Sequence, residues 1–285
     1  MVQECPRIGK SGHPDGNPLR PRCEDAPFKV MKKASGRTLP LSLPRRWVGD
    51  LVAFAQKVPT VMAERTLNVN ALAAARLQVA NPPSWCALIT KAFGLVSARM
   101  PEFRLSFLGF PYPRLYEHPC SVAAIAINRR YGDESAVFLG LMQAPETLPL
   151  QEVNRRVRHF VESPVEEIGC YRRLIRTAKL PLPLRRILWW YGLNGRGKIR
   201  SKTFGTFCVN SVGSFDLRIT QCLTPITTMI YYRSPGPRGE LAIQAAFDHR
   251  VFDAIIIHLG LTELEKFLNN EMVVEVTKSN NKLDL

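Results

Sequence analysis

Apolar residues recur along most of the chain with the spacing of helices or of strands, and the two kinds of segment are interleaved. Apolar positions three and four residues apart predict helices over residues 46–57, 72–76, 84–100, 150–163 and about 254–269. Runs rich in β-branched and aromatic residues predict strands over residues 58–70, 122–128, 136–142, 203–212, 226–232 and 241–247. We therefore predict an α/β fold, a two-layer sandwich in which a mixed β-sheet carries helices on one face.

The two ends of the chain do not follow this pattern. Residues 1–37 are rich in Pro, Gly, Lys and Arg and hold few large apolar side chains, so burial would not offset the entropy lost on ordering them. We expect a flexible basic tail there, one folded domain over residues 38–285, and a polar tail after residue 269.

Residues 171–202 are unusual because ten Lys and Arg residues surround two apolar runs, 180–184 and 187–191. We interpret this segment as an insertion in the domain. It could be a solvated face above an apolar docking helix, a membrane-surface element, or a landing site for an acidic carrier protein. Trp189 and Trp190 beside arginines make contact of residues 182–202 with a membrane surface the most specific alternative.

The formal net charge of +15 indicates an anionic partner, such as nucleic acid, a membrane surface, a phosphate-rich cofactor or an acidic protein. Nucleic acid is not expected, because no zinc finger, RNA-binding signature or helix-turn-helix pattern is found. No apolar run approaches the roughly 18 to 20 residues that span a bilayer, so we expect a cytoplasmic protein, membrane-peripheral at most. Seven scattered cysteines without a CxxC pair predict reduced thiols and no metal site.

A histidine follows the last predicted strand, in the segment 242–254 with the sequence AIQAAFDHRVFDA. His249 comes directly after the strand, and Asp253 stands four residues later at the start of the predicted helix. Taken alone, such a pair is most often a surface histidine with a capping aspartate. Upstream, however, the segment 205–213 (GTFCVNSVG) forms a predicted strand that ends in small polar residues and a glycine.

Together, the two segments resemble the paired signature of the 2-oxoacid dehydrogenase acyltransferase catalytic domains, roughly TFTISNLG followed by DHRVVDG. Further matches fall in the same order, at LPLS (39–42) with two arginines at 45–46, KVP (57–59), NVNAL (68–72), KA (91–92) and PEF (101–103). The resemblance spans residues 39 to 270. It implies a chloramphenicol acetyltransferase-like fold and a stand-alone member of the family without a lipoyl domain.

The resemblance also implies roles for individual residues. An acceptor thiol, hydroxyl or amine must lose a proton as it attacks a thioester, and histidine suits this transfer because it ordinarily titrates near neutral pH. His249 is the implied general base. Asp253 occupies the position of the family's structural aspartate, whose partner here would be Arg45; the alternative is an exposed ion pair of little consequence.

Two positions depart from the family pattern. The hydroxyl that stabilises the oxyanion in the family falls on Asn210, with Ser211 beside it. An asparagine amide can also donate to an oxyanion, and losing such a donor typically costs about a hundredfold to a thousandfold in rate. Ala254 stands where the family has glycine.

The function implied is acyl transfer from a coenzyme A or acyl-carrier-protein thioester to a small acceptor, without a metal. The implied assembly is a homotrimer in which His249 of one chain meets Asn210 or Ser211 of the next. Two alternatives remain open. One is a catalytically impaired binding or scaffold protein with this fold, and the other is an accessory core subunit of a 2-oxoacid dehydrogenase complex.

Several other features are predicted to carry no chemistry. Residues 192–198 (GLNGRGK) fit the phosphate-binding pattern GxxxxGK, but Ile199 replaces the Ser or Thr that would hold magnesium. Cys208 is predicted to pack in the core, because strand alternation sets it between Phe207 and Val209. The remaining histidines are predicted to be surface or packed residues: His13, His118, His159 and His258.

Overall fold

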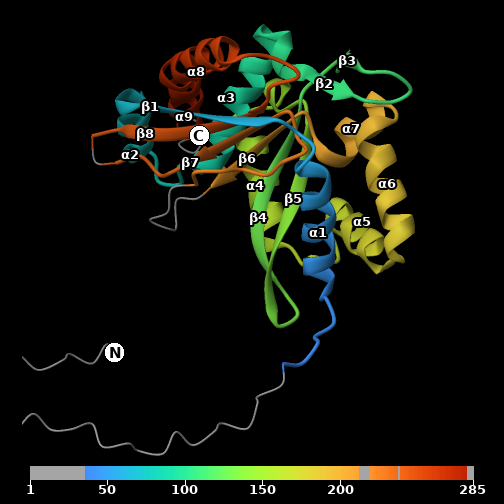
Figure 1. The fold of residues 1–285 in the computed structure, drawn as a ribbon. Helices are drawn as coiled ribbons and strands as arrows, with labels where there is room; N and C mark the ends of the chain where they lie inside the picture. The colour runs from blue at the N-terminus through green and yellow to red at the C-terminus, as the bar shows by residue number, and fades with distance from the viewer. Residues whose placement is uncertain (1–35, 212–218, 237, 281–285) are drawn as a thin grey trace, which may run out of the picture. The chain divides into compact units, whose positions relative to one another are not determined.

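The computed structural model describes residues 36–211, 219–236 and 238–280 (Figure 1). A compact unit begins at Leu41. The predicted tail, residues 1–37, lies almost wholly outside the described residues.

Six strands form the main sheet in the order β1-β8-β7-β6-β4-β5. The strands β4, β6 and β7 run parallel to one another and the remaining pairs are antiparallel, so the predicted mixed sheet is confirmed. The strands are β1 (Thr60–Asn68), β4 (Val122–Tyr131), β5 (Glu134–Gln143), β6 (Phe207–Ser211), β7 (Thr228–Tyr232) and β8 (Glu240–Asp248). A second, two-stranded sheet pairs β2 (Leu105–Leu108) with β3 (Arg114–Glu117).

Helices connect and cover these strands. Those outside the predicted insertion are α1 (Leu43–Ala55), α2 (Asn70–Leu77), α3 (Trp85–Arg99), α4 (Leu150–Glu162), α8 (Ala254–Asn269) and α9 (Glu271–Asn280). The insertion folds into α5 (Gly169–Lys179), α6 (Leu182–Asn194) and α7 (Gly197–Phe204), and two short 3-10 turns are η1 (Pro101–Arg104) and η2 (Pro145–Thr147). The side chains of Ser42 and Ser84 cap α1 and α3 by accepting backbone N–H bonds.

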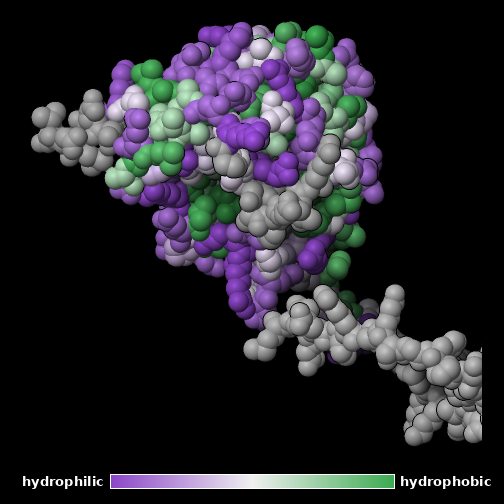
Figure 2. Space-filling view, turned by 90° about the vertical axis from the view of Figure 1, so that its left-hand side faces the viewer, coloured by the Kyte–Doolittle hydropathy of each residue, from purple (hydrophilic) through white to green (hydrophobic). Residues whose placement is uncertain are grey.

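Alternation along β4 explains how both faces of the sheet are used. Ile125 and Ile127 join the main core, to which α3, α4, α8 and α9 contribute buried apolar residues. Ala124 faces the other way and packs with Trp189 of α6 and Phe204 of α7. The predicted helical layer is therefore confirmed, and the insertion adds cover to part of the second face. Figure 2 shows that hydrophilic residues dominate the side of the molecule seen at the left of Figure 1.

Two predicted boundaries were wrong. Residues 271–280, predicted as part of a polar tail, form the helix α9, because Met272 and Val276 are fully buried on one of its faces. Lys91 of α3 fastens this helix through an ion pair of 2.6 Å to Glu275. The strand predicted from residue 203 begins at Phe207, because Phe204 still belongs to α7, where it packs against Trp189.

A buried carboxylate holds the insertion against α1. Asp50 is 1% exposed and accepts a 2.8 Å bond from Arg185 Nε, while Arg186 Nε lies 3.1 Å from its other oxygen. Arg185 is also buried, so water can reach neither charge unless α6 separates from α1. This ion pair fixes the position of α6 relative to α1.

A buried histidine joins the small sheet to the large one. His118 follows β3, is 1% exposed, and its Nε2 lies 3.1 Å from the Ser106 hydroxyl, which in turn lies 3.4 Å from the Thr227 hydroxyl at the start of β7. Burial, and secondarily the charge of Arg200, lowers the pKa of His118 from 6.5 to about 4. His118 is thus packed, one of the two environments, surface or packed, that were predicted for it.

We predict that Asp50→Ala lowers the free energy of unfolding by about 3 kcal/mol, because it leaves the buried Arg185 guanidinium without its carboxylate. Urea denaturation measures the change. Glu134→Ala is the matched control: it removes a carboxylate 3.9 Å from an exposed arginine, Arg45, and should leave stability unchanged. Equal stability of Asp50→Ala and wild type would show that the pair does not hold the insertion.

His118 predicts a pH dependence of stability. Its pKa is lower in the folded protein than in the unfolded chain, so between about 6.5 and about 4 only the unfolded chain binds the proton. The free energy of unfolding should therefore fall as pH falls through this window. The His118→Phe variant should lose this component and show a shallower decline in melting temperature, whereas parallel pH profiles for the two proteins would contradict the assignment.

Candidate active site

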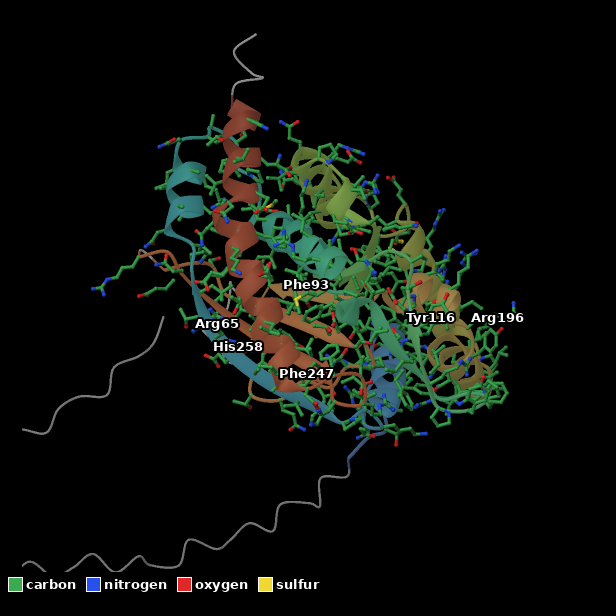
Figure 3. All side chains as sticks on the ribbon, turned by 90° about the horizontal axis from the view of Figure 1, so that it is seen from above. Arg65, Phe93, Tyr116, Arg196, Phe247 and His258 are labelled. Carbon is green, nitrogen blue, oxygen red and sulfur yellow. The ribbon has the colours of Figure 1, made fainter. Side chains whose placement is uncertain are left out.

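Strand β8 delivers His249 to one end of the main sheet. The strand ends at Asp248, and the backbone N–H of His249 donates to the Pro59 carbonyl oxygen at 3.0 Å, just before β1 begins. Beneath the turn, Phe252 packs between Phe247, with ring centres 5.7 Å apart, and Phe103, at 5.4 Å. Figure 3 labels Phe247 and Phe93 in this aromatic layer between α3 and the sheet. The turn is thus anchored by the backbone on one side and by aromatic packing on the other.

The residues on either side of His249 form an ion pair that stiffens the turn. The Asp248 carboxylate is buried and accepts bonds from Arg250 Nε at 2.9 Å and Arg250 Nη2 at 2.7 Å. The backbone N–H of Arg250 donates to the same carboxylate at 3.0 Å. The guanidinium also stacks 4.3 Å above the ring of Phe107. Three hydrogen bonds across two residues leave this turn little conformational freedom.

The imidazole of His249 is held through one nitrogen. Its Nδ1 lies 3.3 Å from the Phe252 carbonyl oxygen and 3.2 Å from Asp253 Oδ1. Both partners are acceptors, which favours a proton on Nδ1 and a free lone pair on Nε2. The side chain is half exposed, and within the described residues no hydrogen-bond partner reaches Nε2. This nitrogen is available to accept a proton from a bound molecule.

The predicted pairing of Asp253 with Arg45 was wrong. The Arg45 side chain is exposed and lies 3.9 Å from Glu134, whereas Asp253 reaches His249. Arg45 stands in the first turn of α1, and only the far end of that helix leads to Pro59 and the His249 turn. Ten helical residues, or about 15 Å, separate Arg45 from the last residue of α1, Ala55. The helix therefore carries Arg45 away from the aspartate.

Asn210 and Ser211 are the last two residues of β6. They lie at the opposite end of the strands from His249. Phe207 shares a row with Thr228 and Phe247, near the histidine, whereas Ser211 shares a row with Tyr232 and Ile243. Five to six residues along the strands, roughly 16 to 20 Å, separate these donors from His249. Asn210 and Ser211 instead interact with the neighbouring side chains of Tyr231 and Tyr232. A single chain does not bring the predicted base and oxyanion donors together.

A cationic pocket of about 180 Å³ lies beside the His249 turn. Lys57, Arg200 and Arg250 line it together with apolar residues of α1, β2 and α6, and no carboxylate is among the described residues of its wall. Arg200 donates to the carbonyl oxygens of Leu193 and Pro225, each at 2.8 Å, and its burial lowers its pKa to about 10, so that it stays charged at neutral pH. Sequence reasoning missed this pocket, because nothing in the pattern places the insertion's Arg200 next to Arg250.

The features predicted to lack chemistry have structural explanations. Cys208 is buried in the second-face core, and burial raises the pKa of its thiol, which disfavours the nucleophilic thiolate. The GxxxxGK residues join two helices, α6 and α7, where a phosphate-binding loop would follow a strand. A Cβ at Gly197 would meet the Tyr116 ring, and Figure 3 labels Tyr116 close to Arg196, the residue before it. These glycines serve helix packing.

The described residues contain no cluster of three or more His, Cys, Asp or Glu side chains arranged to hold a metal ion. None of their helices has the length and apolar character required to cross a membrane.

Comparison with known proteins identifies the fold. No protein-family model matches the sequence, and no curated protein is significantly similar to it. Solved structures do match. Dihydrolipoamide acetyltransferase from Azotobacter vinelandii superimposes with a TM-score of 0.60 and 15% identity, over 86% of this chain and 96% of that one. The cubic core of a pyruvate dehydrogenase complex gives 0.56 and 15%, over 86% and 96%.

A third structure extends the same likeness. The truncated catalytic core of the 2-oxoacid dehydrogenase complex from Thermoplasma acidophilum gives a TM-score of 0.57 and 13% identity, over 82% of this chain and 99% of that one. The chain has the fold of the 2-oxoacid dehydrogenase acyltransferase core.

Proposed function

We propose that the protein is an acyltransferase that moves an acyl group from a thioester to a small acceptor, with His249 as general base. The observation that carries the proposal is the imidazole at the end of β8, tied through Nδ1 and with Nε2 unpartnered among the described residues. In the Azotobacter vinelandii enzyme, a serine, a histidine and an asparagine were examined for roles in the catalytic mechanism, the last two four positions apart. His249 and Asp253 have the same spacing.

The reaction follows from that geometry. The acceptor's thiol, hydroxyl or amine gives its proton to His249 Nε2 as its heteroatom bonds to the thioester carbonyl carbon. The carbonyl oxygen becomes an oxyanion, which hydrogen-bond donors stabilise. When the carbon–sulfur bond breaks, the leaving thiolate takes the proton back from the imidazolium. Asp253, whose Oδ1 lies 3.2 Å from Nδ1, accepts a hydrogen bond from that nitrogen and holds the ring in position for both steps.

We propose that a complete site forms between chains of a homotrimer. Within one chain, His249 and the donors Asn210 and Ser211 stand at opposite edges of the sheet. A neighbouring chain can supply the donors from its own β6, which would bury the exposed histidine. A cubic core, as in the pyruvate dehydrogenase complex, is one assembly that this fold supports elsewhere.

The donor we propose is acyl-coenzyme A or an acylated carrier protein. Both are anionic, which suits a chain of formal charge +15 and the cationic pocket beside the histidine turn. Lys57, Arg200 and Arg250 line that pocket and could pair with phosphate oxygens of such a donor.

A second candidate is a binding or scaffold protein that keeps the fold without turnover. Asp253 lacks its expected arginine, and Asn210 stands where the family has a hydroxyl donor, so both supports of the histidine mechanism are altered. Such a protein would bind coenzyme A without releasing thiol from its acyl form. An accessory role in a 2-oxoacid dehydrogenase complex would additionally need partner chains that carry lipoyl domains.

Mixing the protein with a panel of acyl-coenzyme A donors and small acceptors should release free thiol, measured with a chromogenic disulfide. We expect His249→Ala to lower the rate by a factor of about 10² to 10⁴, the usual contribution of a general base. His258→Ala, on an exposed face of α8, is the control and should keep the wild-type rate. Equal release by wild type and His249→Ala would exclude His249 as the base, and coenzyme A binding without thiol release by wild type would favour the scaffold alternative.

Subunit complementation tests the shared site. His249→Ala and Asn210→Ala should each be impaired, the latter by a factor of about 10² to 10³. When the two variants are unfolded together and refolded, mixed trimers combine an intact histidine with an intact asparagine in some interfaces, so thiol release should recover. No recovery, in mixtures shown by mass spectrometry to contain hybrid assemblies, would mean that each chain works alone.

A further inference from the structure

The outer face of α6 is apolar although it contacts solvent. Its exposed large residues are between 40% and 61% accessible, and they are Leu182, Leu184, Ile187, Leu188, Trp190 and Tyr191. The opposite side of the helix is already occupied, because Trp189 and Leu193 are buried against the sheet and Arg185 is paired with Asp50. A helix that is apolar on all sides is typical of elements covered on all sides. The outer residues of α6 therefore form a candidate contact surface for a partner.

The loop between β2 and β3 extends this apolar surface. Phe110 and Tyr112 are 51% and 65% exposed, and the Phe110 ring packs edge-on against Trp190 with ring centres 5.2 Å apart. We name the six outer residues of α6 together with these two the α6 face. A contiguous exposed patch with four aromatic rings marks an interaction site more often than a random surface.

Positive charge surrounds the α6 face. Between Gly169 and Phe204 the chain holds ten Lys and Arg residues and no Asp or Glu. Two of the arginines, Arg185 and Arg186, form ion pairs with Asp50, and Arg200 is buried. The remaining seven are exposed: Arg172, Arg173, Arg176, Lys179, Arg196, Lys198 and Lys202. Figure 1 shows α5, α6 and α7 gathered on one side of the molecule, so these charges share a region with the α6 face.

This charge restricts what can cover the face. A second copy docked face to face would bring the two cationic segments together, and their repulsion opposes such a dimer. The covering surface must instead be anionic around an apolar centre. A lipid membrane with anionic headgroups has this character, and so does an acidic protein.

A pocket behind the same helices favours lipid. It lies between α5, α6, α7 and β5, has a volume of about 330 Å³, and is lined mainly by apolar side chains, among them Leu139, Leu141, Leu174, Trp189 and Phe204. Leu188 and Tyr191 belong both to its wall and to the α6 face, and Arg173 also lines it. An apolar cavity next to a cation can accept an aliphatic chain whose headgroup stays outside; a membrane offers such chains across the whole α6 face, whereas an acylated carrier protein offers a single one.

We propose that the α6 face docks on a lipid membrane surface that carries anionic headgroups. Leu182, Leu184, Ile187 and Leu188 enter the acyl boundary, and the rings of Trp190 and Tyr191 lie at headgroup level, as aromatic residues do at membrane interfaces. The exposed arginines and lysines of α5 and α7 pair with the headgroups. Membrane docking does not depend on acyl transfer, since Trp190 is the one member of the α6 face that also lines the pocket beside the His249 turn.

Sedimentation of the full chain with vesicles tests the proposal. We expect binding to vesicles of phosphatidylcholine mixed with phosphatidylserine, weakened by high salt, and little binding to phosphatidylcholine alone. Two variants, Leu184→Ser/Ile187→Ser/Leu188→Ser and Arg172→Glu/Arg176→Glu/Lys179→Glu, should each weaken the apparent affinity by at least about tenfold. Melting temperatures and thiol release should stay near wild type, because the altered side chains are exposed and none of them lines the pocket beside the His249 turn.

Matched controls change exposed residues elsewhere. Leu77→Ser/Ile255→Ser removes apolar side chains on α2 and α8 that are 89% and 61% exposed, and Arg158→Glu reverses a surface charge on α4; both should bind vesicles as wild type does. Wild-type protein that stays in solution with every vesicle, or equal binding by all variants, would overturn the proposal. So would protein that ignores vesicles and binds an acidic acyl carrier protein through the same residues, which would identify the face as a protein-binding site.

Discussion

The length of a β-strand is the constraint on which the functional interpretation depends. β6, β7 and β8 lie in fixed register, so the residues that end β6 and the residue that follows β8 are held at opposite edges of the sheet. No side-chain rotation covers a distance of roughly 16 to 20 Å. A base and an oxyanion donor placed in this way can act on one carbonyl only if a second copy of the sheet supplies the missing end, which is why catalysis and assembly are proposed together.

The insertion contributes to the surroundings of the histidine as well as to the surface. Trp190, Leu193 and Asn194 of α6 and Arg200 of α7 line the pocket that also contains Arg250, next to His249. Arg200 reaches this position because its guanidinium bonds the carbonyl oxygens of Leu193 and Pro225, and α6 is fixed in turn by Asp50. A change at the buried ion pair would therefore shift both the α6 face and the cationic pocket.

Periodicity predicted most of the fold because most elements bury one face. The helix over residues 254–269 was predicted at its observed ends, and the strand before His249 to within one residue at each end. The apolar pattern did not predict the helix α9, because its buried face consists of only Met272 and Val276 among polar neighbours. At the candidate site, the sequence placed His249 directly after the strand and Asp253 at the start of the helix, where the structure has them. It could not locate Arg45 correctly, since the position of that side chain depends on the direction of α1, a property of tertiary packing that spacing does not encode.

The exposure of the proposed catalytic groups has a physical consequence for how the site works. The side chains of His249 and Asp253 are 50% and 76% exposed in one chain, so water competes for the imidazole and weakens its interaction with the carboxylate. Contact with a neighbouring chain would remove this water, strengthen the bond between Asp253 and Nδ1, and bring amide or hydroxyl donors opposite Nε2. The two functions of the interface, excluding solvent and supplying donors, then arise from one docking event. An isolated chain would hold a correctly oriented histidine in an environment that cannot stabilise the charges its reaction creates.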